Sequence, residues 1–298
     1  MKVSKLGASH LAVLLFLQVL WLAPSHSQAP TPTRFGQEMS KQEGIYRSTG
    51  NDTPGGYVVA RSLSDYASIL PPGFGGDLAN LGLGDRWLDI GAGEGQAILD
   101  YYTPEYDLPA SAKGSEQRGR KARAVAMSIE DRRTPLWRQK ASSLEVNQIQ
   151  YLFDRPLRGY SRAELGRFQV ITDVIGGFSY TDNLSLFMEK VLGFLELNGS
   201  FYSVLQDVHS EAGTNRPHYP GSPYLTEIRN SDGSELKVCT WLKSISCVQV
   251  TCELRSGWKP LIEVFHVKKV CDNPVVPGLT PVHYEAGTPP ERGFQLRD

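Results

Sequence analysis

The middle of the chain alternates between two patterns of apolar residues, one typical of strands and one typical of helices. Short apolar runs predict strands at residues 85–90, 122–129, 148–153, 168–175 and 200–205. Segments with helical spacing cover residues 58–70, 96–102 and 135–146 and the stretch after Asp182. This alternation is typical of crossover units, so we expect an α/β domain with a doubly wound, mostly parallel sheet and helices on both faces.

The strongest predicted helix follows Asp182. Its apolar side chains recur with the spacing of a helix packed on a sheet, at Leu184, Phe187, Met188, Val191, Leu192 and Leu195. Asn198-Gly199 is expected to end this helix with a left-handed cap. Earlier in the chain, Pro71-Pro72 should stop the first helix, and a glycine-rich connection should lead from there to the first strand.

The end of the domain has a different character. Residues 247–254 and 261–270 are β-rich and are joined by a short turn at residues 256–259, which predicts an antiparallel hairpin. With this hairpin, the sheet would be mixed and would have seven strands. Residues 272–298 are rich in proline and show little periodicity, so we expect an extended surface tail there.

The first 27 residues show the three parts of a secretory signal peptide. Lys2 and Lys5 supply the positive start, and small residues at Ser25-His26-Ser27 offer a cleavage site. The apolar run Leu11–Ala23 is too short to cross a bilayer, which takes about 20 apolar residues; an uncleaved anchor is the alternative. We therefore expect a secreted or periplasmic protein without stable membrane insertion after cleavage.

The predicted organisation has four parts. These are a signal peptide at residues 1–27, an extended arm at 28–56, a globular domain at 57–271 and the proline-rich tail at 272–298. The sequence carries no signal for an oligomeric state.

The four cysteines all lie in the last quarter of the chain, and an oxidising compartment favours two disulfides. Cys247 and Cys252 are five residues apart on one predicted strand and should point to opposite faces, so they should not pair with each other. A turn at residues 256–259 places Cys271 nearer to Cys247. We expect Cys247 to pair with Cys271 and Cys239 with Cys252, and no metal site.

The net charge of −1 hides an uneven distribution. Residues 113–140 hold nine Lys or Arg and three acidic residues, which gives +6 there and leaves −7 elsewhere. Two interpretations stay open: a solvated loop and helix face, or a surface that attracts an anionic substrate. The basic residues lack interleaved aromatics and any nucleic-acid motif, so we expect no nucleic-acid partner.

The segment Asp89-Ile90-Gly91-Ala92-Gly93-Glu94-Gly95 follows an apolar strand and precedes a helix. Glycines allow a tight turn and bring backbone N–H groups close to a ligand, and the helix N-terminus favours an anionic group. Gln96 stands where a dinucleotide-binding loop would have its third glycine. The D-x-G-x-G-x-G pattern and the order of the segments over residues 57–271 resemble class I S-adenosylmethionine-dependent methyltransferases.

The resemblance implies the fold and most of the candidate site. The family fold has seven strands and ends in an antiparallel hairpin. S-adenosylmethionine is the implied cofactor, with Gly91, Gly93 and Gly95 along its methionine and ribose portions. Asp89 would organise the loop and the nearby amine. A glycine turn needed only for strand-to-helix packing is the alternative.

Other positions follow from the same resemblance. The acid that accepts the ribose hydroxyls is replaced by Ser128, and Glu130 either substitutes for it or is a surface acid. Asp154 falls where an acid contacts the adenine amino group, with a turn-forming role as the alternative. Asp173 and Tyr180 follow at the expected floor of the methyl-transfer site, or serve as a strand-end acid and a core aromatic.

Methyl transfer mainly requires alignment of the nucleophile with the sulfonium and exclusion of water. His209 could act as a general base for a hydroxyl or amine acceptor, with ordinary surface polarity as the alternative. The predicted function is methyl transfer to a small-molecule acceptor outside the cytoplasm. The competing hypothesis is a catalytically silent binding or interaction module on the same fold.

Overall fold

The computed structural model describes residues 61–103, 121–128, 131–145, 147–181, 183–206, 238–255, 262–279, 282–285 and 293–296. The predicted signal peptide and the arm lie outside these ranges. In the part that is described, no helix is long and apolar enough to cross a membrane.

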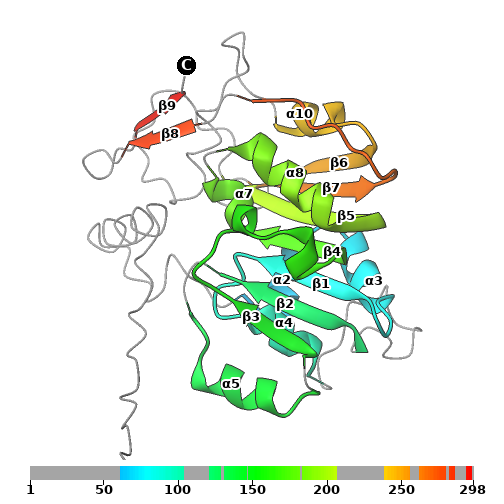
Figure 1. Ribbon diagram of the computed structural model, residues 1–298, viewed down its shortest axis with the longest axis vertical. Helices are drawn as coiled ribbons and strands as arrows, with labels where there is room; N and C mark the ends of the chain where they lie inside the picture. The colour runs from blue at the N-terminus through cyan, green and yellow to red at the C-terminus, as the bar shows by residue number, and fades with distance from the viewer. Residues whose placement is uncertain are drawn as a thin grey trace, which may run out of the picture. The chain divides into compact units, whose positions relative to one another are not determined.

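A seven-stranded sheet with the order β3-β2-β1-β4-β5-β7-β6 forms the centre of the domain (Figure 1). The strands are β1 (Arg86–Ile90), β2 (Arg123–Met127), β3 (Ile149–Leu152), β4 (Phe168–Val174), β5 (Leu195–Gln206), β6 (Val248–Arg255) and β7 (Ile262–Lys269). The first five run parallel, and β7 is antiparallel to both β5 and β6. The predicted fold class is therefore confirmed, including the antiparallel hairpin at its end.

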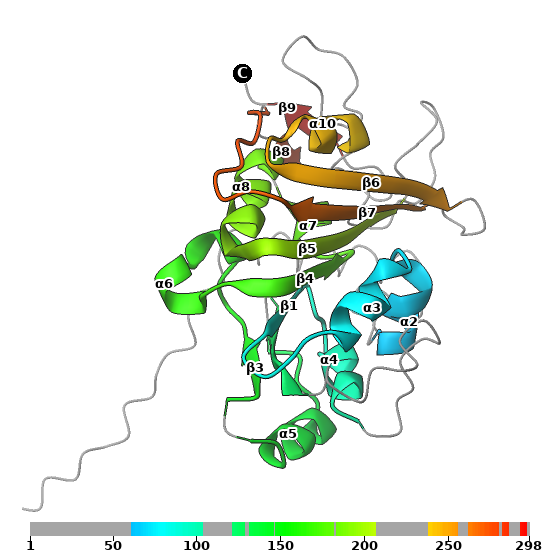
Figure 2. The same cartoon turned by 90° about the vertical axis from the view of Figure 1, so that its right-hand side faces the viewer.

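Helices cover both faces of this sheet, as Figure 2 shows for α2, α3 and α4 on one side and α6 and α8 on the other. The first face carries α2 (Leu63–Ile69), α3 (Gly73–Ala79), α4 (Gln96–Tyr101) and α5 (Pro135–Ser142). The second carries η3 (Leu157–Gly159), α6 (Arg162–Leu165), α7 (Gly177–Tyr180), α8 (Leu184–Phe194) and α10 (Val238–Ser244). Strand residues alternate between the two apolar cores, so that Trp87 packs in the first and Leu88 in the second.

Helix α3 stands where we predicted a glycine-rich connection, and that prediction is wrong. The glycines of the segment follow the two prolines, and Pro72 occupies the N-cap position of α3. The apolar side chains of Phe74 and Leu78 are buried against the first face of the sheet. Their four-residue spacing forms one turn of helix, and this burial outweighs the low helix propensity of glycine.

Helix α8 ends at Phe194, and the predicted cap at Asn198-Gly199 is wrong. Both residues lie inside β5, where the register against β4 shifts and Asn198 adopts φ 64°. The end of the helix is instead bound by a buried cation. The Nζ of Lys269 donates to the carbonyl oxygens of Leu192 and Leu195 at 3.0 and 3.1 Å.

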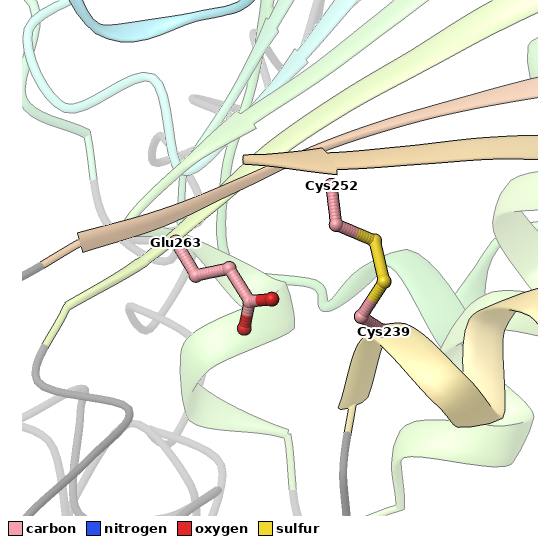
Figure 3. A group of neighbouring side chains, drawn as sticks. All are labelled: Cys239, Cys252 and Glu263. Atoms are coloured by element: carbon pink, nitrogen blue, oxygen red, sulfur yellow. A yellow bond between two sulfur atoms is a disulfide. The ribbon is translucent and has the colours of Figure 1, made fainter. Parts of the chain in front are cut away.

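The expected disulfides are confirmed. Cys239 of α10 bonds to Cys252 of β6, and Cys247 bonds to Cys271. Figure 3 shows Glu263 of β7 beside the first of these bonds. A sulfur that is engaged in a disulfide has no thiolate to offer a metal ion, so this group of three side chains does not form a metal site.

The start of the predicted tail is hydrogen-bonded to the body of the domain. Val275 donates its backbone N–H to Ser246, and the carbonyl oxygen of Pro277 accepts from the indole of Trp241 in α10. Further on, β8 (Val282–Glu285) and β9 (Gly293–Leu296) pair antiparallel as a separate two-stranded sheet. Side chains of the domain thus bind the main chain at Val275 and Pro277, in a stretch that lacks periodicity of its own.

Candidate functional site

The glycine loop, defined as residues 91–95, leaves β1 at the carboxyl edge of the parallel strands. Gly91, Gly93 and Gly95 all have positive φ, at 71°, 56° and 78°, a region that glycine adopts more readily than residues with a side chain. The backbone N–H of Ala92 donates to the carbonyl of Met127 and so ties the loop to the end of β2. In open α/β sheets, ligands bind at this edge.

Two of the three glycines are also required by contacts inside the protein. A Cβ at Gly91 would lie 2.5 Å from the Cα of Gly176, in the loop after β4. A Cβ at Gly95 would lie 2.6 Å from Nε1 of Trp137 in α5. Close packing therefore favours glycine at positions 91 and 95 whether or not a ligand binds.

Asp89 is completely buried at the end of β1, directly before the loop. Its carboxylate accepts hydrogen bonds from the phenol of Tyr66 at 3.0 and 3.1 Å and from the hydroxyl of Thr172 at 2.7 Å. Burial raises the pKa of Asp89 to about 7, against the opposing effect of these hydrogen bonds. The side chain thus joins α2, β1 and β4 beneath the loop.

Asp173 lies on the neighbouring strand β4, where Ile90 is its register partner, and is also fully buried. Its two oxygens accept the backbone N–H groups of Gly176 and Phe178 at 2.8 and 2.9 Å. Burial raises its pKa to about 7, and the nearby charge of Asp89 acts in the same direction. Asp173 therefore organises the loop after β4. Among the described residues, the hydrogen-bond donors to the two carboxyl groups are neutral, and the charge of Arg61 lowers the pKa of Asp89.

Ser128 follows β2 and donates its N–H to the carbonyl of Leu152 on β3. Its hydroxyl donates to the phenol oxygen of Tyr151, and the phenol donates in turn to the carbonyl oxygen of Gly93. The backbone nitrogen of Arg132 donates to the same phenol oxygen at 3.4 Å. Tyr151 thus joins the glycine loop to the end of β2. Sequence reasoning missed Tyr151, because an aromatic residue in an apolar strand has the pattern of an ordinary core position.

Trp137 lies beside Tyr151, with ring centroids 5.4 Å apart at 80°. Thr134 caps the start of α5 and accepts the N–H of Trp137, which fixes the tryptophan in the first turn. The indole ring is 4% exposed, and its Nε1 has no hydrogen-bond partner among the residues described. A buried donor without an acceptor is rare. Sequence reasoning did not single out Trp137 either.

A cation covers this aromatic group. The guanidinium of Arg133 lies 5.9, 5.5 and 5.3 Å from the ring centroids of Trp137, Tyr151 and Phe153. Asp131 fixes it through hydrogen bonds of 2.7 and 2.8 Å and also binds Arg138 at 3.0 Å. These hydrogen bonds hold the pKa of Asp131 well below its usual range. We call Trp137, Tyr151 and Phe153 the aromatic wall.

The remaining predicted site residues are only partly placed. Asp154 is exposed after β3 and adopts φ 65°, which agrees with a turn-forming aspartate. Tyr180 ends α7, and its side chain lies outside the described structure. Glu130 and His209 lie outside it as well. The structure therefore brings together Asp89, the glycine loop, Ser128 and Asp173.

No protein-family model matches the chain, and no curated protein matches it. Solved structures resemble it in fold. The O-methyltransferase TomG from Streptomyces achromogenes, solved in complex with SAM, is 13% identical with a TM-score of 0.44, over 81% of this chain and 92% of that one. A putative O-methyltransferase from Klebsiella pneumoniae is 14% identical with a TM-score of 0.42, over 79% and 99%.

An rRNA methylase from Streptococcus thermophilus is 12% identical with a TM-score of 0.40, over 66% of this chain and 95% of that one. At such identities the likeness is one of fold alone. What this chain binds has to be argued from its own residues.

Proposed function

We propose that this domain binds S-adenosylmethionine at the glycine loop and transfers its methyl group to a small-molecule acceptor. The observation that carries the proposal is the set of groups beneath and beside the loop. Two buried carboxyl groups, Asp89 and Asp173, lie under a positive-φ loop at the carboxyl edge of a parallel sheet. The hydrogen-bond donors that face them are neutral, and the charge of Arg61 offsets only part of the effect of burial on Asp89, so a bound cation would stabilise their ionised forms.

The residues present fit this cofactor. Its sulfonium and amino groups are cationic and suit the region of the two carboxyl groups, and its ribose offers oxygen atoms to the orphan donor of Trp137. Backbone groups of residues 91–95 would hold the methionine and ribose portions, with Glu130 and Asp154 as further ligands. When bound, the cofactor supplies an electrophilic methyl group.

The chain's own residues would align the acceptor with the methyl group and exclude water from the site. Asp173 positions the loop after β4 through two backbone hydrogen bonds, which makes it a positioning residue in this proposal. Tyr180 would border the reacting atoms. His209 would remove a proton from a hydroxyl or amine acceptor.

The acceptor and its compartment are part of the same proposal. The predicted signal peptide and the two disulfides favour a site of action outside the cytoplasm. The basic stretch at residues 113–140 favours an anionic acceptor, and no nucleic-acid partner is proposed.

A second candidate is a silent interaction module. It is favoured by the packing roles of Gly91 and Gly95 and by the replacement of the ribose-binding acid by Ser128. On this hypothesis the loop geometry would persist without any cofactor.

Calorimetric titration of the oxidised protein with S-adenosylmethionine and S-adenosylhomocysteine distinguishes the methyltransferase from the silent interaction module. Micromolar binding of either compound supports the proposed function and justifies a screen for acceptors. Absence of binding at millimolar concentration contradicts it and favours the interaction module.

A further inference from the structure

Trp137 carries a hydrogen-bond donor that the described protein does not use. Its Nε1 is buried, lacks an acceptor among the described residues and lies against the backbone of Gly95. Leaving a buried donor unpaired costs about 1–3 kcal/mol, so such groups usually serve a ligand or a bound solvent molecule. The donor therefore points to an acceptor atom that arrives from outside the chain, at the glycine loop.

Tyr151 supplies a second polar atom at the same place. Its phenol oxygen touches three segments at once: the carbonyl of Gly93, the side chain of Ser128 and the N–H of Arg132. It lies on the β3 side of the loop, with its ring packed edge-on against Trp137. Both polar atoms thus lie between the glycine loop and the ends of β2 and β3, beside Ser128, which stands where the resembling family has a carboxylate.

The aromatic wall keeps these two atoms in place. Trp137 and Tyr151 are 4% and 7% exposed, and Arg133 lies over both rings. Because Asp131 fixes the guanidinium, neither ring can swing away without breaking that contact. The donor and the hydroxyl are therefore preorganised, which lowers the entropic cost of binding a ligand there.

We propose that Trp137 and Tyr151 are ligand-positioning residues that bind the ribose of a nucleoside ligand through the indole N–H and the phenol hydroxyl. Together with Ser128, these neutral groups take the place of the missing carboxylate. The indole donates to a ribose oxygen. The phenol keeps its donation to Gly93 and accepts from a ribose hydroxyl in place of its 3.4 Å contact with the N–H of Arg132. This inference rests on the proposed function, because it assigns the ribose end of that cofactor.

The test compares S-adenosylhomocysteine binding to the full oxidised chain and to Tyr151→Phe and Trp137→Phe variants by calorimetry. Loss of one hydrogen bond is expected to weaken binding about five- to tenfold in each variant. Tyr202→Phe is the matched control. This variant removes a phenol hydroxyl that is hydrogen-bonded to Asp77 elsewhere on the same face of the sheet. Its affinity for S-adenosylhomocysteine should stay within about twofold of that of the wild type.

Competition with adenosine and 2′-deoxyadenosine gives a readout for the ribose itself. The wild type should prefer adenosine, and Tyr151→Phe should lose most of that preference. In ¹⁵N spectra, the indole signal that is absent from Trp137→Phe should shift downfield when S-adenosylhomocysteine is added to the wild type.

The outcomes are distinguishable. If the wild type binds S-adenosylhomocysteine and both variants bind it equally well, the assignment of Trp137 and Tyr151 is wrong and the proposed function stands. Tighter binding by Tyr151→Phe would show that the phenol obstructs the site, which also overturns the assignment. If the wild type binds nothing, the proposed function fails first. Should Trp137→Phe not fold, the isosteric Tyr151→Phe variant decides.

Discussion

The phenol oxygen of Tyr66 lies 3.0 and 3.1 Å from the two carboxylate oxygens of Asp89, and both side chains are buried. This contact joins α2 to the end of β1, directly before the glycine loop. Tyr66 has the sequence pattern of any core aromatic in an amphipathic helix, so its role could not be predicted from the sequence.

The contribution of this contact to the unfolding free energy should depend on pH. Hydrogen bonds to charged groups contribute about 1.5–3 kcal/mol and those between neutral groups about 0.5–1.5 kcal/mol. Asp89 has a pKa of about 7, so Tyr66→Phe should lower the unfolding free energy more at pH 8.5 than at pH 5. Urea unfolding at both values measures this. Equal losses at the two pH values would contradict it, and Tyr202→Phe, away from Asp89, is the control.

The two buried carboxyl groups also predict the pH dependence of the wild type. Their pKa values are raised to about 7 in the folded state, whereas an unfolded aspartate titrates near about 3.9. Between these values the folded state binds more protons, so the unfolding free energy should fall as the pH rises from about 4 to about 7 and then level off.

Asp89→Asn removes one of these titrations. The unfolding free energy of this variant should fall less steeply between pH 4 and pH 7 than that of the wild type. Some pH dependence should remain, because Asp173 still titrates. Urea midpoints at unit pH steps give the slope. An unchanged slope would show that Asp89 is already ionised in this range.

Gly95 and Gly76 form a matched pair of glycines. Gly95→Ala would place a Cβ 2.6 Å from Trp137 Nε1 at φ 78°, and we expect a loss of about 1–3 kcal/mol. Gly76 lies in α3, where a Cβ meets nothing within 4 Å, so Gly76→Ala should gain about 0.4–1 kcal/mol. Thermal unfolding of both variants checks the prediction. A stable Gly95→Ala protein would mean that α5 does not pack against the loop.

Lys269 ends α8 in place of a glycine cap. Lys269→Met keeps most of the side-chain volume but leaves the carbonyl oxygens of Leu192 and Leu195 without this donor, so we expect a loss of about 1–3 kcal/mol. Lys268→Met, at the neighbouring half-buried position, is the control and should change stability by less than about 0.5 kcal/mol. Equal melting temperatures for the two variants would contradict the capping role.

The sheet could be predicted from the sequence because its signals are local. Apolar runs marked each of the seven strands, and the turn between β6 and β7 set a register that brought Cys271 near Cys247. The glycine loop was also predictable, since its spacing after an apolar strand needs no distant contact.

The predictions that were wrong, and the residues that were not singled out, depend on tertiary contacts. The end of α8 is decided by Lys269, about 75 residues further along the chain, and Asn198-Gly199 instead accommodates a register shift in β5. Trp137 and Tyr151 look like core residues in sequence, and only their meeting at Gly95 and Gly93 distinguishes them. Gly93 itself has φ 56°, so a bulky substitution there would strain the apo fold as well as block a ligand.

The most direct test of the central claim is calorimetric titration of the oxidised wild-type protein with S-adenosylmethionine and S-adenosylhomocysteine at pH 8, where Asp89 and Asp173 would be free to ionise. The account predicts micromolar binding that weakens as the pH falls below about 7, because protonated carboxyl groups no longer stabilise the cationic groups of the ligand. Absence of binding at millimolar concentration and at every pH would contradict it.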